Sequence, residues 1–132
     1  PYLGADRISA DVDQMVSFLK NNASRGDMIC LHACCHNPTG IDPSHEQWSV
    51  IADTVADIGM IPFVDFAYQG FGDGLDEDRF GLNLILERSE EAIICASFSK
   101  NFGLYSERIG AAIFICKDAP SAEATLSQGK VV

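Results

Sequence analysis

Hydrophobic positions along the chain follow two spacings, one helical and one continuous. Apolar residues three or four positions apart, as on one face of a helix, occur in three segments: 12–19, 48–55 and 80–88. Continuous apolar runs of strand length occur in four: 28–32, 60–64, 92–96 and 109–116. The sequence therefore predicts strands and helices in alternation. A further helix is predicted to start at Asp118-Ala119-Pro120, because proline is tolerated in a first turn.

Polar residues predict where two of these helices begin. Asp11 is suited to cap the helix over 12–19. Ser44 and Gln47 have the spacing of a capping box ahead of the second helix, and Gly59 is placed to end it. These signals support the helices independently of their apolar spacing.

The alternation indicates an α/β fold with a mostly parallel sheet that helices cover on both faces. The fourth strand follows the third after only a loop, whereas a parallel crossover normally needs a longer connection. We therefore expect it to run antiparallel or to reach a more distant place in the sheet. In open α/β sheets, ligands bind at the carboxyl ends of the strands. Three polar clusters follow strands here: His36-Asn37, Asp65 and residues 97–100.

Composition narrows the range of partners. The 132 residues suit one domain with a modest core. The net charge is −10 and the nine Lys and Arg residues form no run, which argues against nucleic acid or an anionic membrane surface as a partner. Five cysteines without a C-x-x-C pair are typical of a reducing compartment. The sequence thus predicts a cytoplasmic protein, with an organelle left open.

Lys100 is the first candidate for covalent chemistry. It follows an apolar run in a hydroxyl-rich loop, with Ser97 before it and Arg108 eight residues on. A lysine amine can form a Schiff base with an aldehyde, while hydroxyl and guanidinium groups can hold a phosphate. The segment therefore suits a phosphate-bearing aldehyde. The alternative is a surface loop with a solvated lysine, and the segment alone does not decide between the two.

Four other residues extend this interpretation. Asp65 directly follows an apolar strand, so it is suited either to pair with the protonated nitrogen of a pyridine ring or to cap the next turn. Tyr68 and Asn37 are suited to donate to a ring oxygen, and their alternatives are aromatic packing and a plain turn residue. His32 is placed to support Asp65, although a histidine satisfied within the core is the more frequent role.

The sequence predicts no metal site. Cysteines and histidines are dense over residues 30–36. Zinc sites, however, pair two closely spaced ligands with a second pair further along, and the chain has no such second pair.

Three sequence blocks resemble a single family. They are residues 31–40 (L-H-A-C-C-H-N-P-T-G), 64–71 (V-D-F-A-Y-Q-G-F) and 97–110 (S-F-S-K-N-F-G-L-Y-S-E-R-I-G). Together they resemble class I aminotransferases that depend on pyridoxal phosphate (PLP), most closely the aspartate and aromatic aminotransferase subgroup. The resemblance implies the large domain of the fold-type I PLP enzymes. Residues 1–132 would be its central segment, without the flanking parts or the small domain.

The resemblance also implies a role for each candidate. Lys100 would form the Schiff base with pyridoxal 5′-phosphate and later move the proton between Cα and the cofactor carbon. Asp65 would pair with the pyridine nitrogen, with His32 near it. Tyr68 and Asn37 would contact the ring oxygen.

Ser97 and Arg108 would hold the phosphate. The implied activity transfers an amino group between an L-amino acid, aspartate or aromatic, and a 2-oxo acid such as 2-oxoglutarate, by ping-pong turnover in a homodimer. The isolated 132-residue chain is expected to be inactive, because the resemblance implies that other parts of the site would belong to flanking segments. Another fold-type I enzyme, such as a lyase or decarboxylase, and a module that lacks the cofactor stay open. So does the choice between aspartate and aromatic substrates.

Overall fold

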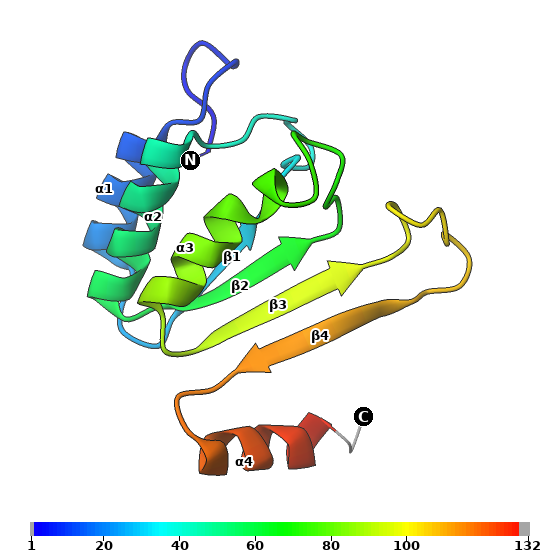
Figure 1. The fold of residues 1–132 in the computed structure, drawn as a ribbon. Helices are drawn as coiled ribbons and strands as arrows, with labels where there is room; N and C mark the ends of the chain where they lie inside the picture. Colours follow the sequence, from blue (N-terminus) through cyan, green and yellow to red (C-terminus); the bar gives the residue numbers. More distant parts are fainter. Residues whose placement is uncertain (1, 130–132) are drawn as a thin grey trace.

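In the computed structural model, which describes residues 2–129, four strands form one sheet in chain order (Figure 1). They are β1 (Met28–His32), β2 (Ile61–Phe66), β3 (Ala92–Ser97) and β4 (Gly110–Ile115). β1, β2 and β3 pair in parallel, and β4 pairs antiparallel to β3. The mostly parallel sheet is thus confirmed. Of the two orientations left open for the fourth strand, the structure has the antiparallel one, which a short loop permits.

The described residues also form four α-helices and a short 3-10 helix. They are α1 (Val12–Asn22), α2 (His45–Ile58), η1 (Glu77–Arg79), α3 (Phe80–Arg88) and α4 (Ala119–Gly129). Asp11 and Ser44 cap α1 and α2 as predicted, each accepting a hydrogen bond from the backbone N–H three residues on. Gln47 completes the capping box of α2, and Gly59 ends that helix at a φ of 77°.

The helices α1, α2 and α3 form a layer on one face of the sheet (Figure 1). Burial alternates along β2, so that Pro62, Val64 and Phe66 are buried and the residues between them are only half-buried. The α/β class is confirmed. The prediction that helices cover both faces of the sheet is wrong for the described residues, because these three helices cover one face only. The reason is topological: the crossovers through α2 and α3 advance in the same direction across the sheet, so both helices lie on one side.

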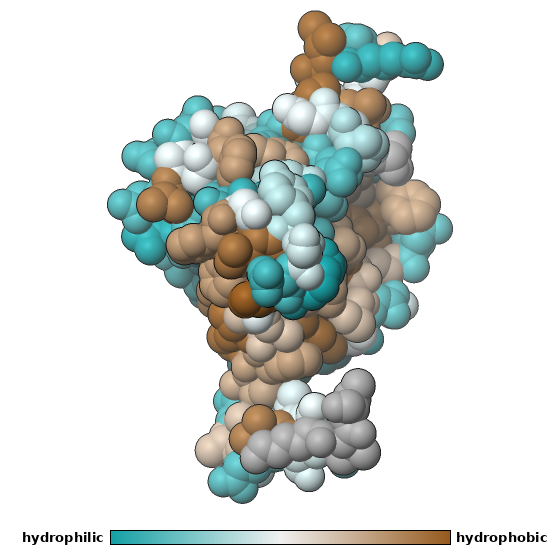
Figure 2. All heavy atoms as spheres, turned by 90° about the vertical axis from the view of Figure 1, so that its right-hand side faces the viewer, coloured by the Kyte–Doolittle hydropathy of each residue, from teal (hydrophilic) through white to brown (hydrophobic). Residues whose placement is uncertain are grey.

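The strand β4 lies beyond this helix layer. All six of its residues are exposed, and its large apolar side chains Ile113, Phe114 and Ile115 keep 46%, 49% and 37% of their surface accessible. The helix α4 lies beside β4, where the Cys116 thiol is 3.8 Å from the hydroxyl of Thr125. Figure 2 shows apolar surface over this lower part of the molecule. The strand β4 and the helix α4 therefore contribute little to the core.

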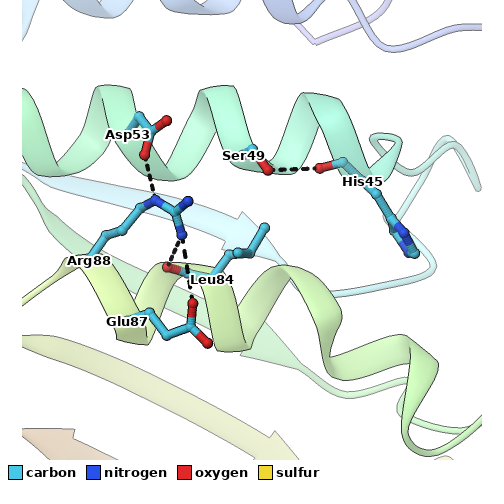
Figure 3. A network of polar contacts seen from close by, with 6 residues as sticks. All are labelled: His45, Ser49, Asp53, Leu84, Glu87 and Arg88. Carbon is cyan, nitrogen blue, oxygen red and sulfur yellow. Dashed lines mark hydrogen bonds and ion pairs between the residues drawn. The ribbon is translucent and has the colours of Figure 1, made fainter.

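Two contacts hold α3 against α2. At the end of α3, the Arg88 guanidinium forms an ion pair with Asp53 and donates to the Leu84 carbonyl at 3.5 Å (Figure 3). At the start of α3, Gly81 lies against Trp48, since a Cβ at this glycine would be 2.3 Å from the indole ring. The helix is thus fixed near both ends.

We expect Gly81→Ala to lower the free energy of unfolding by about 1–3 kcal/mol, because the added methyl group would overlap the Trp48 ring and push α2 and α3 apart. Urea unfolding of the full-length protein, followed by circular dichroism, measures the change. Gly129→Ala is the matched control: this glycine is also helical, and a Cβ there meets nothing within 4 Å. The control should stay within about 0.5 kcal/mol of the parent. Equal stabilities for the two variants would contradict the close approach of the helices.

Candidate active site

The carboxyl ends of β1, β2 and β3 all lie at one edge of the sheet (Figure 1). The turn with Asn37 follows β1, Asp65 and Tyr68 lie at the end of β2 and just beyond it, and Lys100 follows β3. Parallel pairing therefore brings the three polar clusters of the sequence to a common edge, which is where open α/β sheets bind their ligands.

The Lys100 amine lies near two tyrosine rings. Its Nζ is 5.0 Å from the ring centroid of Tyr105 and 6.0 Å from that of Tyr68, distances at which a cation is attracted to an aromatic face. Within residues 2–129, no carboxylate forms an ion pair with it. Its backbone is fixed in a turn, because the Lys100 carbonyl accepts from Gly103 N at 3.1 Å. The half-buried lysine thus has an ordered backbone, and its amine is without an ion-pair partner in the described chain.

Asp65 and His32 are neighbours across the pairing of β1 with β2. Both lie on the face of the sheet opposite to Val64, so they avoid the core beneath the helices. The Asp65 carboxylate accepts one hydrogen bond, from Ala67 N at 3.2 Å, and no cation of the described chain pairs with it. It thus retains capacity for a further donor.

The ring of His32 is oriented by the turn that follows β1. Its Nδ1 accepts a hydrogen bond from the backbone N–H of Asn37 at 3.4 Å. A ring nitrogen that accepts carries no proton, so the proton of the neutral ring is assigned to Nε2. The predicted association of His32 with Asp65 agrees with this arrangement, because the remaining N–H is a donor and Asp65 is an acceptor.

The turn that carries Asn37 is fixed by a carboxylate that the sequence analysis did not single out. Asp42 accepts hydrogen bonds from the backbone N–H groups of Cys35 and His36, at 2.6 and 2.8 Å. The His36 ring stacks on Tyr2, with 3.7 Å between the centroids, and its Nδ1 is 2.8 Å from the Thr39 hydroxyl. Burial, together with the nearby His32, lowers the pKa of His36, so this ring stays neutral near neutral pH.

Ser97 and Arg108 both lie at the corner between β3 and β4. Ser97 pairs with Gly110, and a Cβ at that glycine would be 2.6 Å from the Ala96 carbonyl, so the two strands are closely apposed here. The Ser97 hydroxyl accepts from Ser99 N at 3.2 Å. Arg108 is exposed, has a φ of 52°, and forms no hydrogen bond or ion pair within the described chain. The structure thus brings the two residues to one corner without bonding them to each other.

Several polar groups at this edge of the sheet have no partner in the described chain, and their chemistry shows whether the site suits PLP. The Lys100 amine, the Asp65 carboxylate and the Arg108 guanidinium have no counterion among residues 2–129. In addition, the buried Asn101 Oδ1, next to Lys100, has no hydrogen-bond partner. An aldehyde, a protonated ring nitrogen and a phosphate would complement the amine, the carboxylate and the guanidinium in turn. The donor set therefore fits this cofactor.

The structure does not join all the predicted site residues to one another, and it adds Tyr105 to them. No hydrogen bond or ion pair joins Lys100 to Asp65 in the described chain, and Asn37 is exposed. Tyr105 lies closer to the amine than Tyr68 does, and its position in the same block as Lys100 is a signal that could have pointed to it. No group of three or more metal-binding side chains gathers anywhere in residues 2–129.

Comparisons with known proteins agree with this geometry. The family described as "Aminotransferase class I and II" matches residues 1–129. The chain is 46% identical to aspartate aminotransferase of Haemophilus influenzae over 99% of its own length and 33% of that relative. It is 47% identical to aromatic-amino-acid aminotransferase of Paracoccus denitrificans over 97% of its length and 32% of the relative. The chain thus spans about a third of the curated relatives that it matches.

Solved structures give the same result. The fold matches an aromatic amino acid aminotransferase with 3-indolebutyric acid at a TM-score of 0.89 and 47% identity, over 97% of this chain and 32% of that one. An aromatic-amino-acid aminotransferase from Burkholderia pseudomallei, covalently bound to pyridoxal phosphate, matches at a TM-score of 0.90 and 38% identity, over 97% of this chain and 32% of that one.

No helix in the described part of the chain is long and apolar enough to cross a membrane. The family match along nearly the whole sequence confirms the resemblance of the three blocks, and the chain belongs to the class I and II aminotransferases.

Proposed function

We propose that the full-length protein is a PLP-dependent aminotransferase that transfers an amino group between an L-amino acid and a 2-oxo acid. Family membership supports this proposal, as do the names of the relatives, which include aspartate and aromatic-amino-acid aminotransferases. The observation that carries it is the Lys100 amine, which lies at the carboxyl end of β3 within cation–π distance of Tyr68 and Tyr105 and has no carboxylate partner in the described chain. A half-buried lysine near two aromatic rings at this edge of the sheet suits the attachment of an aldehyde better than it suits a solvated surface position.

Six residues at this edge would hold the cofactor. Lys100 would bind its aldehyde, and Asp65 would accept a hydrogen bond from its ring nitrogen. Tyr68 and Asn37 would contact the ring oxygen, and Ser97 and Arg108 the phosphate. When bound, PLP supplies an electron sink for the carbanion that forms at the substrate Cα.

The residues of this chain supply orientation and proton transfer. The Lys100 Nζ is the atom proposed to take a proton from Cα and to return it, since lysine amines serve as general bases when they are held at the reacting carbon. Tyr68 and Tyr105 lie near this amine and would help to position it. The Asp65 carboxylate would keep the ring nitrogen protonated, because a nearby negative charge stabilises a cation. His32 accepts from Asn37 N and is paired with Asp65 across the strands, so its remaining ring N–H would help to orient that carboxylate.

The substrate class is proposed to be aspartate or aromatic L-amino acids, with 2-oxoglutarate as an amino acceptor. Relatives with either name match at similar identity, from 44% to 47%. The sequence is therefore compatible with both substrate classes. We propose in addition a homodimer and a cytoplasmic location. Free cysteines in the described chain support a reducing compartment, whereas one similar relative, from Arabidopsis thaliana, is named chloroplastic.

Borohydride reduction with added PLP tests the attachment site. In the full-length protein we expect a pyridoxyl adduct on the peptide that carries Lys100, and its loss in Lys100→Ala, because borohydride reduces the C=N bond that the lysine amine forms with the aldehyde to a stable secondary amine. Peptide mass mapping measures both. Lys117→Ala is the matched control, since this lysine is exposed and lies away from the proposed site. An adduct that survives in Lys100→Ala would overturn the proposal.

Asp65→Asn tests the ring-nitrogen partner. We expect kcat/KM for transamination to fall by roughly 10²-fold or more, because an amide cannot stabilise the protonated nitrogen as a carboxylate does. The rate is measured with aspartate or phenylalanine and 2-oxoglutarate, and its dependence on the 2-oxo acid distinguishes a transaminase from a lyase or decarboxylase. Asp57→Asn, an exposed change of equal charge on α2, should keep the parent rate. Equal rates for the two variants would contradict the role of Asp65.

A further inference from the structure

The loop between β2 and η1 carries Tyr68 near its start and Asp78 at its end. Asp78 is buried, with 7% of its surface exposed, although it is a charged residue. Within residues 2–129, no lysine, arginine or histidine forms an ion pair with it. A buried carboxylate without a cation needs other donors, so its surroundings explain why it is there.

Four backbone N–H groups of the same loop surround the Asp78 carboxylate. Its Oδ2 accepts from Gly70 N at 2.7 Å and Gly72 N at 3.0 Å. Its Oδ1 accepts from Asp73 N at 2.8 Å and Gly74 N at 3.4 Å. Burial raises the pKa of Asp78, but these four N–H groups outweigh that effect and lower it, so the group is ionised near neutral pH. The loop thus forms an anion-binding nest around a carboxylate of its own chain.

The glycines of the loop are fitted to this arrangement. Gly70 and Gly74 have φ values of 91° and 151°, a backbone region that favours glycine. At Gly72, a Cβ would be 2.5 Å from Asp78 Oδ1. The glycine-rich composition therefore allows the backbone to wrap closely around the carboxylate.

The carboxylate is attached to the rigid part of the fold. Asp78 lies in η1, directly before α3, and the start of α3 is packed against α2. Gly81 touches the Trp48 ring, and Phe80 stacks on His45 with 3.8 Å between the ring centroids. The nest is thus anchored to the helix layer and not to another loop.

The same hydrogen bonds reach Tyr68. The Tyr68 carbonyl accepts from Phe71 N at 3.0 Å, which closes a turn over residues 68–71. Gly70 N, inside that turn, donates to Asp78. The phenol ring of Tyr68 is half-buried and lies 6.0 Å from the Lys100 amine. A short and continuous path of contacts therefore joins the carboxylate to a proposed site residue.

We propose that Asp78 is a positioning residue for Tyr68: its carboxylate fixes the loop over 67–76 to the start of α3 and so holds the phenol beside the Lys100 amine. This inference rests on the proposed function only in identifying PLP as the ligand that Tyr68 would contact. The anchoring itself rests on the hydrogen bonds described above.

Asp78→Asn is the sharpest change, because it keeps the shape of the side chain and replaces one acceptor oxygen by an NH₂ donor. In either orientation of the amide, two of the four N–H groups would then face a donor. Asp73→Asn is the matched control. It removes the same charge from the same loop, but the Asp73 side chain is exposed and accepts no hydrogen bond in the described chain.

Amide hydrogen exchange in the full-length protein without cofactor tests the anchoring. We expect Asp78→Asn to speed exchange at residues 70–74 by about tenfold or more, since loss of the nest lowers the local stability of the loop. Exchange in α1 should stay unchanged, and Asp73→Asn should match the parent throughout. Unchanged exchange at residues 70–74 in Asp78→Asn would overturn the proposal.

The second measurement asks whether Asp78 acts through Tyr68. The absorbance of bound PLP is titrated against pH in the parent, Tyr68→Phe, Asp78→Asn and the double variant. We expect Asp78→Asn to shift the titration midpoint in the same direction as Tyr68→Phe, and the double variant to show less than the sum of both shifts. An unshifted midpoint in Asp78→Asn, or shifts that add fully in the double variant, would overturn the proposal. With a lower melting temperature, such a result would mean that Asp78 only stabilises the fold.

Two further provisions separate a failure of this proposal from a failure to fold and from a failure of the proposed function. If Asp78→Asn fails to fold, Gly72→Ala replaces it, because its Cβ would displace the carboxylate by contact at 2.5 Å while the charge is kept. The same faster exchange and the same midpoint shift are then expected. If the parent protein binds no PLP, the proposed function fails, and the exchange experiment still decides whether Asp78 holds the loop.

Discussion

Parallel hydrogen bonding from β1 to β2 and from β2 to β3 assembles the candidate site. His32 pairs with Asp65, and Asp65 pairs with Cys95, two residues before Ser97. Side chains alternate between the faces of a strand, so a slip of one residue would turn Asp65 into the core and bring Val64 to the site. The buried side chains of Leu31, Val64 and Ile94 prevent such a slip. The core beneath the helices thus sets the face on which the polar groups lie.

Three carboxylates near this edge differ in how many hydrogen bonds they accept. Asp78 accepts four from the backbone and Asp42 accepts two, and both shape loops that carry site residues. Asp65 accepts one, from Ala67 N. A carboxylate has about four lone-pair sites, so those of Asp78 are fully occupied and it contributes order, whereas Asp65 retains most of its sites for a ligand. Asp42 lies between the two, and its two bonds to the backbone indicate a structural role.

Much of the framework could be predicted because its signals are local. The capping box at Ser44 and the bounds of α3 depend on neighbours in sequence, and the strand ends depend on where the apolar runs stop. The roles of Asp42 and Asp78 could not be predicted, because each depends on backbone N–H groups whose directions are set by the folded loop. The one-sided helix layer was missed for a similar reason. Apolar strands indicate burial on both faces, but they do not say which segments supply it.

The nest around Asp78 has a consequence for the anions of the site. Backbone N–H groups that converge on one point would also attract a free phosphate. Here the place is taken by a tethered carboxylate, whose effective concentration far exceeds that of a dissolved ion. The nest beside Tyr68 is therefore already occupied by a carboxylate of the same chain, and the proposed phosphate-binding residues Ser97 and Arg108 lie outside it.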